Sequence, residues 1–328
     1  MNRLRRYGMV SVVLFTSLLA CLVPAAVAQE RGVPQSIVRQ VVHIVIRSDP
    51  FGPLYRLFAE DFQLPVASPP NRSARPAGYI SAGNVYLEFI SVAPLPSASP
   101  SDTRAAFMGF SFEPLPLEQS VAELDRRGIT HGPVEPFSRD PKDWPFFTLV
   151  MLTELSERWD GTAPVSMAPA ETGFFSLPLR ASGLVIYLSE YHDQQWPEIF
   201  VRDLAPANRP ALREQLRARE GGPLGILGVK EITIGVTGYS GAIARWERGL
   251  RPAPSLGEGA WAVGEGPAIR LVPATDVGIL SLTFAVQSIA RTRDFLAGRD
   301  MRGESSAERV TISPSTVQGL DCHFVEAR

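Results

Sequence analysis

Two stretches decide the fold: QVVHIVI at residues 40–46 and GNVYLEFI at residues 83–90. The first is an alternating run of β-branched residues, which predicts a strand. The second opens on a Gly-Asn turn signal and continues as another strong strand. Between them, apolar residues three and four positions apart predict one face of a helix: Leu54, Leu57, Phe58 and Phe62. Residues 40–90 are therefore expected to form one unit of strand, helix and further strands.

The same pattern recurs three more times along the chain. The later units begin with strand-forming runs at residues 107–112, 229–234 and 279–284. The second unit closes at residues 183–192, after a segment rich in Pro, Phe and Trp that is longer than the unit requires. We therefore expect an α+β fold built from four related units.

The repeat predicts which way the polar residues of the strands point. A strand alternates its faces, and the helix of each unit must bury its apolar stripe on one face of the sheet. Ile44 and Ile46 are therefore expected under the helix, and His43 on the other face. Glu88 is likewise a polar residue among apolar neighbours. If two units curl around that second face, His43 and Glu88 converge on one cavity.

The first 28 residues have the features of an export signal. Three arginines precede an apolar run over residues 9–22, and AVA at residues 26–28 fits a small-x-small cleavage site. We predict a signal peptide over residues 1–28 and a periplasmic or secreted protein. Two alternatives stay open: a lipobox that would leave a lipid anchor on Cys21, and a twin-arginine signal.

Length and composition exclude several classes of protein. The chain has 328 residues, enough for two ordinary domains. Its net charge of -2 lacks the excess of basic residues that would indicate a nucleic-acid-binding protein. No segment after residue 28 is long enough and apolar enough to be a transmembrane helix. Of the two cysteines, Cys21 lies in the leader and leaves Cys322 alone, so no internal disulfide is expected.

The residues around His43 and Glu88 resemble the vicinal oxygen chelate superfamily, which includes glyoxalase I, extradiol dioxygenases and the fosfomycin- and bleomycin-resistance proteins. The resemblance covers nearly all of the mature chain and is strongest in the first unit. It implies an α+β fold of four βαβββ modules paired into two glyoxalase-like domains, whose curled mixed sheets form cups. The expected boundaries are 38–202 for the first domain, 203–225 for a linker and 226–328 for a second, degenerate domain.

The resemblance also implies a metal site. In such families, His and Glu side chains from the first and last strands of the units hold one divalent metal, which chelates vicinal oxygens of the substrate. His43, Glu88 and Glu190 are the implied metal ligands here, and Glu88 or Glu190 is also the implied proton-transfer base. Imidazole and carboxylate suit Zn, Fe, Mn or Ni, and a catalytic centre needs about three protein ligands with one position open.

The other units depart from the family pattern. The place in the second unit that matches His43 falls on Gly109 or Ser111, neither of which is a useful ligand. The second domain offers no convincing set at the matching places: Glu231, Arg270, Ser281 and His323. That domain is therefore expected to pack, to form a homodimer or to bind something without a metal.

Three functions follow as hypotheses. The first is an exported glyoxalase-like metalloprotein with isomerase, lyase or dioxygenase chemistry on a small molecule with vicinal oxygens. The second is a non-catalytic protein of the same fold that sequesters a small molecule. The third is a partner-binding module. Two simpler explanations of the polar residues also stay open: Glu88 paired with an arginine such as Arg47, or a His43–Glu88 pair without a metal.

Overall fold

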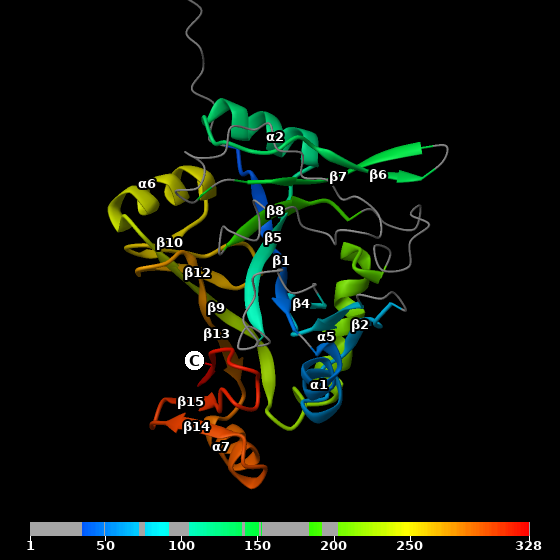
Figure 1. The fold of residues 1–328 in the computed structure, drawn as a ribbon, viewed down its shortest axis with the longest axis vertical. Coiled ribbons are helices and arrows are strands. Elements are labelled where there is room, and N and C mark those ends of the chain that lie inside the picture. Colours follow the sequence, from blue (N-terminus) through cyan, green and yellow to red (C-terminus); the bar gives the residue numbers. More distant parts are fainter. Residues whose placement is uncertain are drawn as a thin grey trace, which may run out of the picture. The chain divides into compact units, whose positions relative to one another are not determined.

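The computed structural model describes residues 35–327, except for 49, 72–75, 92–104, 140–141, 151, 153–183 and 192–202. Residues 34–328 form one compact unit. Within it, the strands make two eight-stranded mixed sheets (Figure 1). Among the described residues, no helix is long and apolar enough to cross a membrane.

The first sheet contains two βαβββ modules. The elements of the first module are β1 (Val38–Arg47), α1 (Phe51–Arg56), the π-helical turn η1 (Leu57–Asp61), β2 (Val66–Ser68), β3 (Ala77–Ser81) and β4 (Tyr86–Ile90). Those of the second are β5 (Ala106–Pro114), α2 (Leu117–Arg126), β6 (Glu135–Arg139), β7 (Lys142–Leu149) and β8 (Val185–Ser189). A linker follows, with the short helix η4 (Pro206–Asn208) and the helix α5 (Arg209–Ala218).

The second sheet repeats this plan. The elements of the third module are β9 (Ile226–Val236), α6 (Tyr239–Leu250), β10 (Ser255–Gly257), β11 (Ala260–Trp261) and β12 (Ala268–Pro273). Those of the fourth are β13 (Gly278–Val286), α7 (Ile289–Gly298), β14 (Arg302–Ser305), β15 (Arg309–Ile312) and β16 (Cys322–Glu326). The prediction of an α+β fold with four βαβββ modules is confirmed.

Both sheets share one topology. Their strand orders are β2-β3-β4-β1-β5-β8-β7-β6 and β10-β11-β12-β9-β13-β16-β15-β14. The first strand of each module runs parallel to the last strand of the same module, and the two first strands meet antiparallel at the centre. This arrangement brings the first and last strands of two modules side by side, so polar residues on those strands share the middle of one face.

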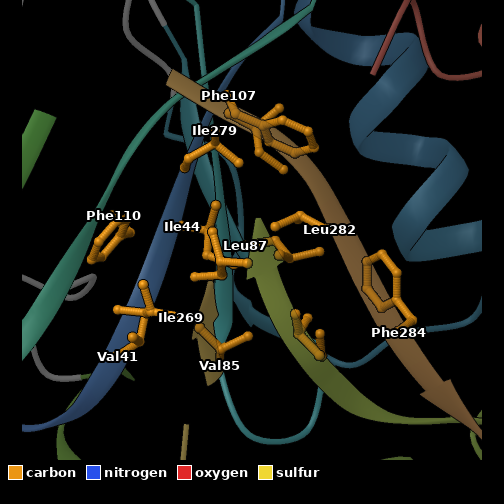
Figure 2. Close-up of a cluster of buried hydrophobic side chains, with 14 of the residues drawn as sticks. Val41, Ile44, Val85, Leu87, Phe107, Phe110, Ile269, Ile279, Leu282 and Phe284 are labelled. Atoms are coloured by element: carbon orange, nitrogen blue, oxygen red, sulfur yellow. The ribbon is translucent and has the colours of Figure 1, made fainter. Parts of the chain in front are cut away.

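The apolar faces of the two sheets contribute to one hydrophobic core. Figure 2 shows Val41, Ile44 and Leu87 of the first sheet among Ile269 and Leu282 of the second. Fully burying a side chain of this size contributes roughly 1.5–3 kcal/mol. The opposite face of the first sheet, which carries the polar residues of its central strands, is called the polar face below.

The alternation expected for the first strand is present. Ile44 and Ile46 are fully buried members of the core, whereas His43 is outside that cluster on the polar face. The strands of the first sheet lie between residues 38 and 189 and those of the second between 226 and 326. Because residues 34–328 are one compact unit, the two-domain division stays a prediction.

Candidate functional site

The strand register places His43 and Glu88 side by side. In the parallel pair of β1 and β4, His43 is the partner of Tyr86, so Glu88 lies two residues further along the same face. His43 Nε2 lies 3.3 Å from Glu88 Oε2. The site predicted from the two strands is thus assembled as a direct contact between an imidazole and a carboxyl group.

Two tyrosines hold this pair from either side. Tyr79, which faces Glu88 across β3 and β4, donates its hydroxyl to Glu88 Oε1 at 2.5 Å. The Tyr191 hydroxyl lies 3.0 Å from His43 Nδ1. When His43 carries its proton on Nε2 and points it at Glu88, Nδ1 is the acceptor for Tyr191. The four side chains form a continuous row, called here the His43–Glu88 site: each tyrosine is hydrogen-bonded to one member of the pair, and His43 and Glu88 are in contact at 3.3 Å.

Burial decides the protonation states of this site. His43 is 4% exposed, and removal from water lowers its pKa to about 3. Burial raises the pKa of Glu88 to about 7, while the hydrogen bond from Tyr79 acts in the opposite direction. Burial also raises the pKa values of Tyr79 and Tyr191 well above 10, so both stay phenols. Near neutral pH the site therefore has a neutral imidazole beside a carboxyl group that is partly protonated.

The matching positions of the second module hold serines. Ser111 is the partner of His43 across β1 and β5, and Ser189 follows Tyr187 of β8 as Glu88 follows Tyr86 of β4. Both serines are buried, and Ser111 Oγ donates to Ser189 Oγ at 2.8 Å. Two neutral hydroxyls, hydrogen-bonded to each other, thus stand where a second His and Glu would complete a set of metal ligands.

Glu190 lies elsewhere. Its Oε2 accepts a 3.0 Å hydrogen bond from the backbone N–H of Leu117, the first residue of α2. A carboxylate there satisfies one of the unpaired N–H groups at a helix N-terminus and is favoured by the helix dipole. The structure therefore brings together His43 and Glu88 of the three predicted site residues, and gives Glu190 a helix-capping contact.

The site has fewer protein ligands than a catalytic metal needs. Within the described residues, no group of three or more His, Cys, Asp or Glu side chains could hold a metal ion. His43 and Glu88 offer two ligands, whereas catalytic zinc sites use three protein ligands with an open position. The described residues therefore do not fit a resident catalytic metal.

The second sheet carries a different pair at the same places. Glu231 of β9 occupies the position of His43, and Arg270 of β12 that of Glu88. Arg270 Nε donates to Glu231 Oε2 at 2.9 Å, and the two side chains are 40% and 20% exposed. His323, expected on this face, pairs with Asp321 at 2.6 Å. The second sheet therefore holds a half-exposed ion pair in place of a buried acid–base pair.

The sequence analysis missed both tyrosines of the site. Tyr191 lies two residues after Ser189, and Tyr79 lies in β3, directly opposite Glu88. Period-two alternation beyond the end of β8 could have indicated Tyr191. Tyr79 becomes a neighbour of Glu88 only because β3 pairs with β4, and the sequence alone does not show which strands pair.

No protein-family model matches this sequence, and no curated protein matches it. Solved structures are similar in fold. The structure of homoprotocatechuate 2,3-dioxygenase from Arthrobacter globiformis has a TM-score of 0.52 at 10% identity, covering 90% of this chain and 82% of that one. That of homoprotocatechuate 2,3-dioxygenase from Brevibacterium fuscum has a TM-score of 0.50 at 10% identity, covering 89% and 82%. A Mn(II)-bound glyoxalase from Novosphingobium aromaticivorans has a TM-score of 0.49 at 10% identity, covering 89% and 83%.

Proposed function

We propose that this chain, which has the fold of the vicinal oxygen chelate superfamily, binds a small molecule with neighbouring oxygen atoms at the His43–Glu88 site. The observation that carries the proposal is the contact between His43 and Glu88 on the polar face, with Tyr191 hydrogen-bonded to His43 and Tyr79 to Glu88. Buried polar groups are costly unless paired, and convergent polar groups in an apolar surround are typical of ligand sites.

The site offers complementary groups to a molecule with two adjacent oxygens. Neutral His43 donates or accepts one proton, and Glu88 accepts or donates another, because its pKa lies near 7. Tyr79 and Tyr191 fix the orientation of the two groups before a ligand arrives. A ligand that replaces the 3.3 Å contact between His43 Nε2 and Glu88 Oε2 with two hydrogen bonds leaves no buried group unpaired.

A metal-dependent lyase, isomerase or dioxygenase is the second candidate. The observation that favours it is that His43 and Glu88 keep two of the family's ligand positions, with their donor atoms 3.3 Å apart. The serines at the other two positions oppose it. No step of that chemistry follows from this donor set, so metal-free binding is the function that the geometry supports best.

The test combines metal analysis with a binding titration. The protein is purified without chelators, its metal content is measured by mass spectrometry, and catechol binding is measured by isothermal titration calorimetry. We expect no stoichiometric transition metal and a measurable affinity for catechol. His43→Ala should weaken that affinity by about tenfold, because a buried ligand group left without its hydrogen-bond partner costs about 1–3 kcal/mol.

The matched control is His323→Ala on the second sheet, whose imidazole contacts Asp321. This variant should bind catechol as the unchanged protein does. One transition metal per chain, lost in His43→Ala and kept in His323→Ala, would replace metal-free binding with the metal-dependent enzyme. Catechol affinity that neither variant changes would remove the His43–Glu88 site from the proposal.

Export is proposed on the sequence of residues 1–28 alone, which lie outside the described residues. A positive start, an apolar run and a small-x-small motif support cleavage after Ala28. Amino-terminal sequencing of the protein from its own cell should find Gln29 first. A lipid-modified Cys21 at that end would favour the anchored alternative. A homodimer also stays a prediction.

A further inference from the structure

The two buried serines of the second module lie next to the His43–Glu88 site. Ser111 of β5 is opposite His43 on β1, and Ser189 is the last residue of β8. The two serines are 0% and 4% exposed, and Ser111 Oγ donates a hydrogen bond to Ser189 Oγ at 2.8 Å. Tyr191 comes two residues after Ser189, just beyond the end of β8. The serine pair therefore ends two residues along the chain from the phenol that contacts His43.

Ser189 donates a hydrogen bond to Tyr191. Burial raises the pKa of Tyr191 well above 10, and a hydrogen bond with the Ser189 side chain acts in the opposite direction. A hydrogen bond lowers the pKa of a phenol when it stabilises the phenolate, whose oxygen can only accept. Ser189 is therefore the donor in this bond and the Tyr191 oxygen is the acceptor. The single hydroxyl hydrogen of Tyr191 is left for a different acceptor.

That acceptor is His43 Nδ1, which lies 3.0 Å from the Tyr191 oxygen. An imidazole nitrogen that accepts a hydrogen bond carries no proton, so the neutral ring of His43 holds its proton on Nε2. Nε2 is the atom that lies 3.3 Å from Glu88 Oε2. Each hydroxyl has one hydrogen to donate, so the direction that begins at Ser111 passes through Ser189 and Tyr191 to the imidazole.

The other tautomer of His43 would break this order. With its proton on Nδ1, the imidazole would donate to the Tyr191 oxygen, to which Ser189 already donates. The hydroxyl hydrogen of Tyr191 would then lose its acceptor in a buried place. Folded proteins rarely keep a buried donor without an acceptor. The cost of such a donor should favour the Nε2–H tautomer by on the order of tenfold.

We infer that Ser111 and Ser189 are positioning residues of the His43–Glu88 site, which act through Tyr191 to keep the proton of His43 on Nε2. His43 then presents an N–H donor beside the Glu88 carboxyl group, and a ligand meets this donor with an acceptor oxygen. The effect on ligand binding rests on the proposed function. The tautomer itself is a property of the free protein and is measured without a ligand.

Nitrogen-15 nuclear magnetic resonance of the full-length protein, labelled in its histidines, measures the tautomer. The chain has four histidines, and the signals lost in His43→Gln identify those of His43. Spectra are recorded at pH 6, where His43 is neutral and Glu88, whose pKa burial raises to about 7, is mostly protonated. A protonated carboxyl group can donate to Nε2 or accept from it, so it leaves the choice of tautomer to Tyr191. The unchanged protein should show the Nε2–H tautomer.

Ser189→Ala should raise the ratio of the Nδ1–H to the Nε2–H tautomer by on the order of tenfold, because Tyr191 no longer accepts a hydrogen bond from position 189. Ser189→Thr keeps a hydroxyl group and should restore the Nε2–H tautomer. Ser111→Ala acts one hydrogen bond further away and should have a smaller effect. The matched control is Ser81→Ala in the same sheet, which should leave the tautomer unchanged. Ser81 is 2% exposed, and its Oγ accepts from the Gly83 backbone N–H at 3.4 Å.

Catechol affinity should follow the tautomer, because apparent affinity falls with the fraction of molecules in the binding-competent form. Ser189→Ala should therefore bind catechol up to about tenfold more weakly than Ser189→Thr and Ser81→Ala do. An unchanged tautomer in Ser189→Ala, or the Nδ1–H tautomer in the unchanged protein, would overturn the inference and leave both serines as packing residues. If the tautomer depends on Ser189 but catechol binds to no variant, the positioning role holds and the proposed function fails.

Discussion

The two sheets have the same strand order and place different chemistry at the same positions. The first sheet holds His43 and Glu88, with side chains 5% and 15% exposed, and the second holds Glu231 and Arg270 at 20% and 40%. The first pair is desolvated, so its ionised forms are disfavoured. The second pair keeps part of its hydration and behaves as an ordinary ion pair. The same two positions thus hold a buried histidine–carboxyl contact in one sheet and a partly exposed ion pair in the other.

Exchanging the two pairs between the sheets should have the largest effect on stability and tests the role of burial directly. His43→Glu/Glu88→Arg places an ion pair in the buried position, and we expect it to lower the free energy of unfolding by about 1–4 kcal/mol, because desolvation exceeds the Coulomb gain. Glu231→His/Arg270→Glu makes the reverse exchange at the half-exposed position and should cost about 1 kcal/mol or less. Urea denaturation measures both. Equal costs would show that burial does not distinguish the two positions.

The dependence of stability on pH should distinguish the contribution of Glu88 from that of His43. Between about pH 4.5 and 7, folded Glu88 keeps a proton that the unfolded chain has lost, so its contribution to stability falls as pH rises. Between about pH 3 and 6.5, unfolded His43 carries a proton that the folded chain lacks, so its contribution rises with pH. In the overlap of the two ranges the contributions oppose each other.

Single substitutions should reveal how each of the two groups makes stability change with pH. Glu88→Gln should leave a stability that rises with pH from about 3 to 6.5, and His43→Gln one that falls from about 4.5 to 7. Each slope should approach 1.4 kcal/mol per pH unit at most, the value for one proton. Thermal unfolding across this pH range measures the slopes. A slope of the opposite sign in either variant would mean that the remaining group is charged in the folded state.

Tyr79→Phe should sharpen the role of the first-sheet tyrosines. It removes the hydrogen bond to Glu88, so the pKa of Glu88 should rise above about 7, and stability should fall by about 1–2 kcal/mol. Nuclear magnetic resonance titration of the Glu88 carboxyl carbon measures the pKa. The control is Tyr55→Phe, since among the described residues the buried Tyr55 hydroxyl has no hydrogen-bond partner. An unchanged pKa of Glu88 would contradict the contact with Tyr79.

The smallest effect is expected from the second-sheet pair. Glu231→Gln keeps the shape of the side chain and removes its charge, and it should cost about 0.2–1 kcal/mol, as half-exposed ion pairs do. The loss should shrink further in 1 M salt, because screening already weakens the pair. Urea denaturation at low and high salt measures both values. A loss above 2 kcal/mol would show that Glu231 and Arg270 are shielded from water as strongly as His43 and Glu88.

The sequence by itself determined the four modules and the facing of the central strands. Their β-branched runs, amphipathic helices and turn signals are local, and alternation along a strand follows from backbone geometry, so Ile44 and His43 could be assigned to opposite faces. His43 and Glu88 could be named as one site because two polar residues stood out in two apolar strands of the same unit.

Tertiary structure alone decided how that site is completed. Tyr79 meets Glu88 through a strand pairing, and Tyr191 meets His43 across 148 positions of sequence. Glu190 differs by one residue from Ser189, and that single step sends its carboxylate to the first turn of α2. Long-range pairing, register and burial depend on the whole fold, which is why these neighbours and the pKa values they set are not visible in the sequence.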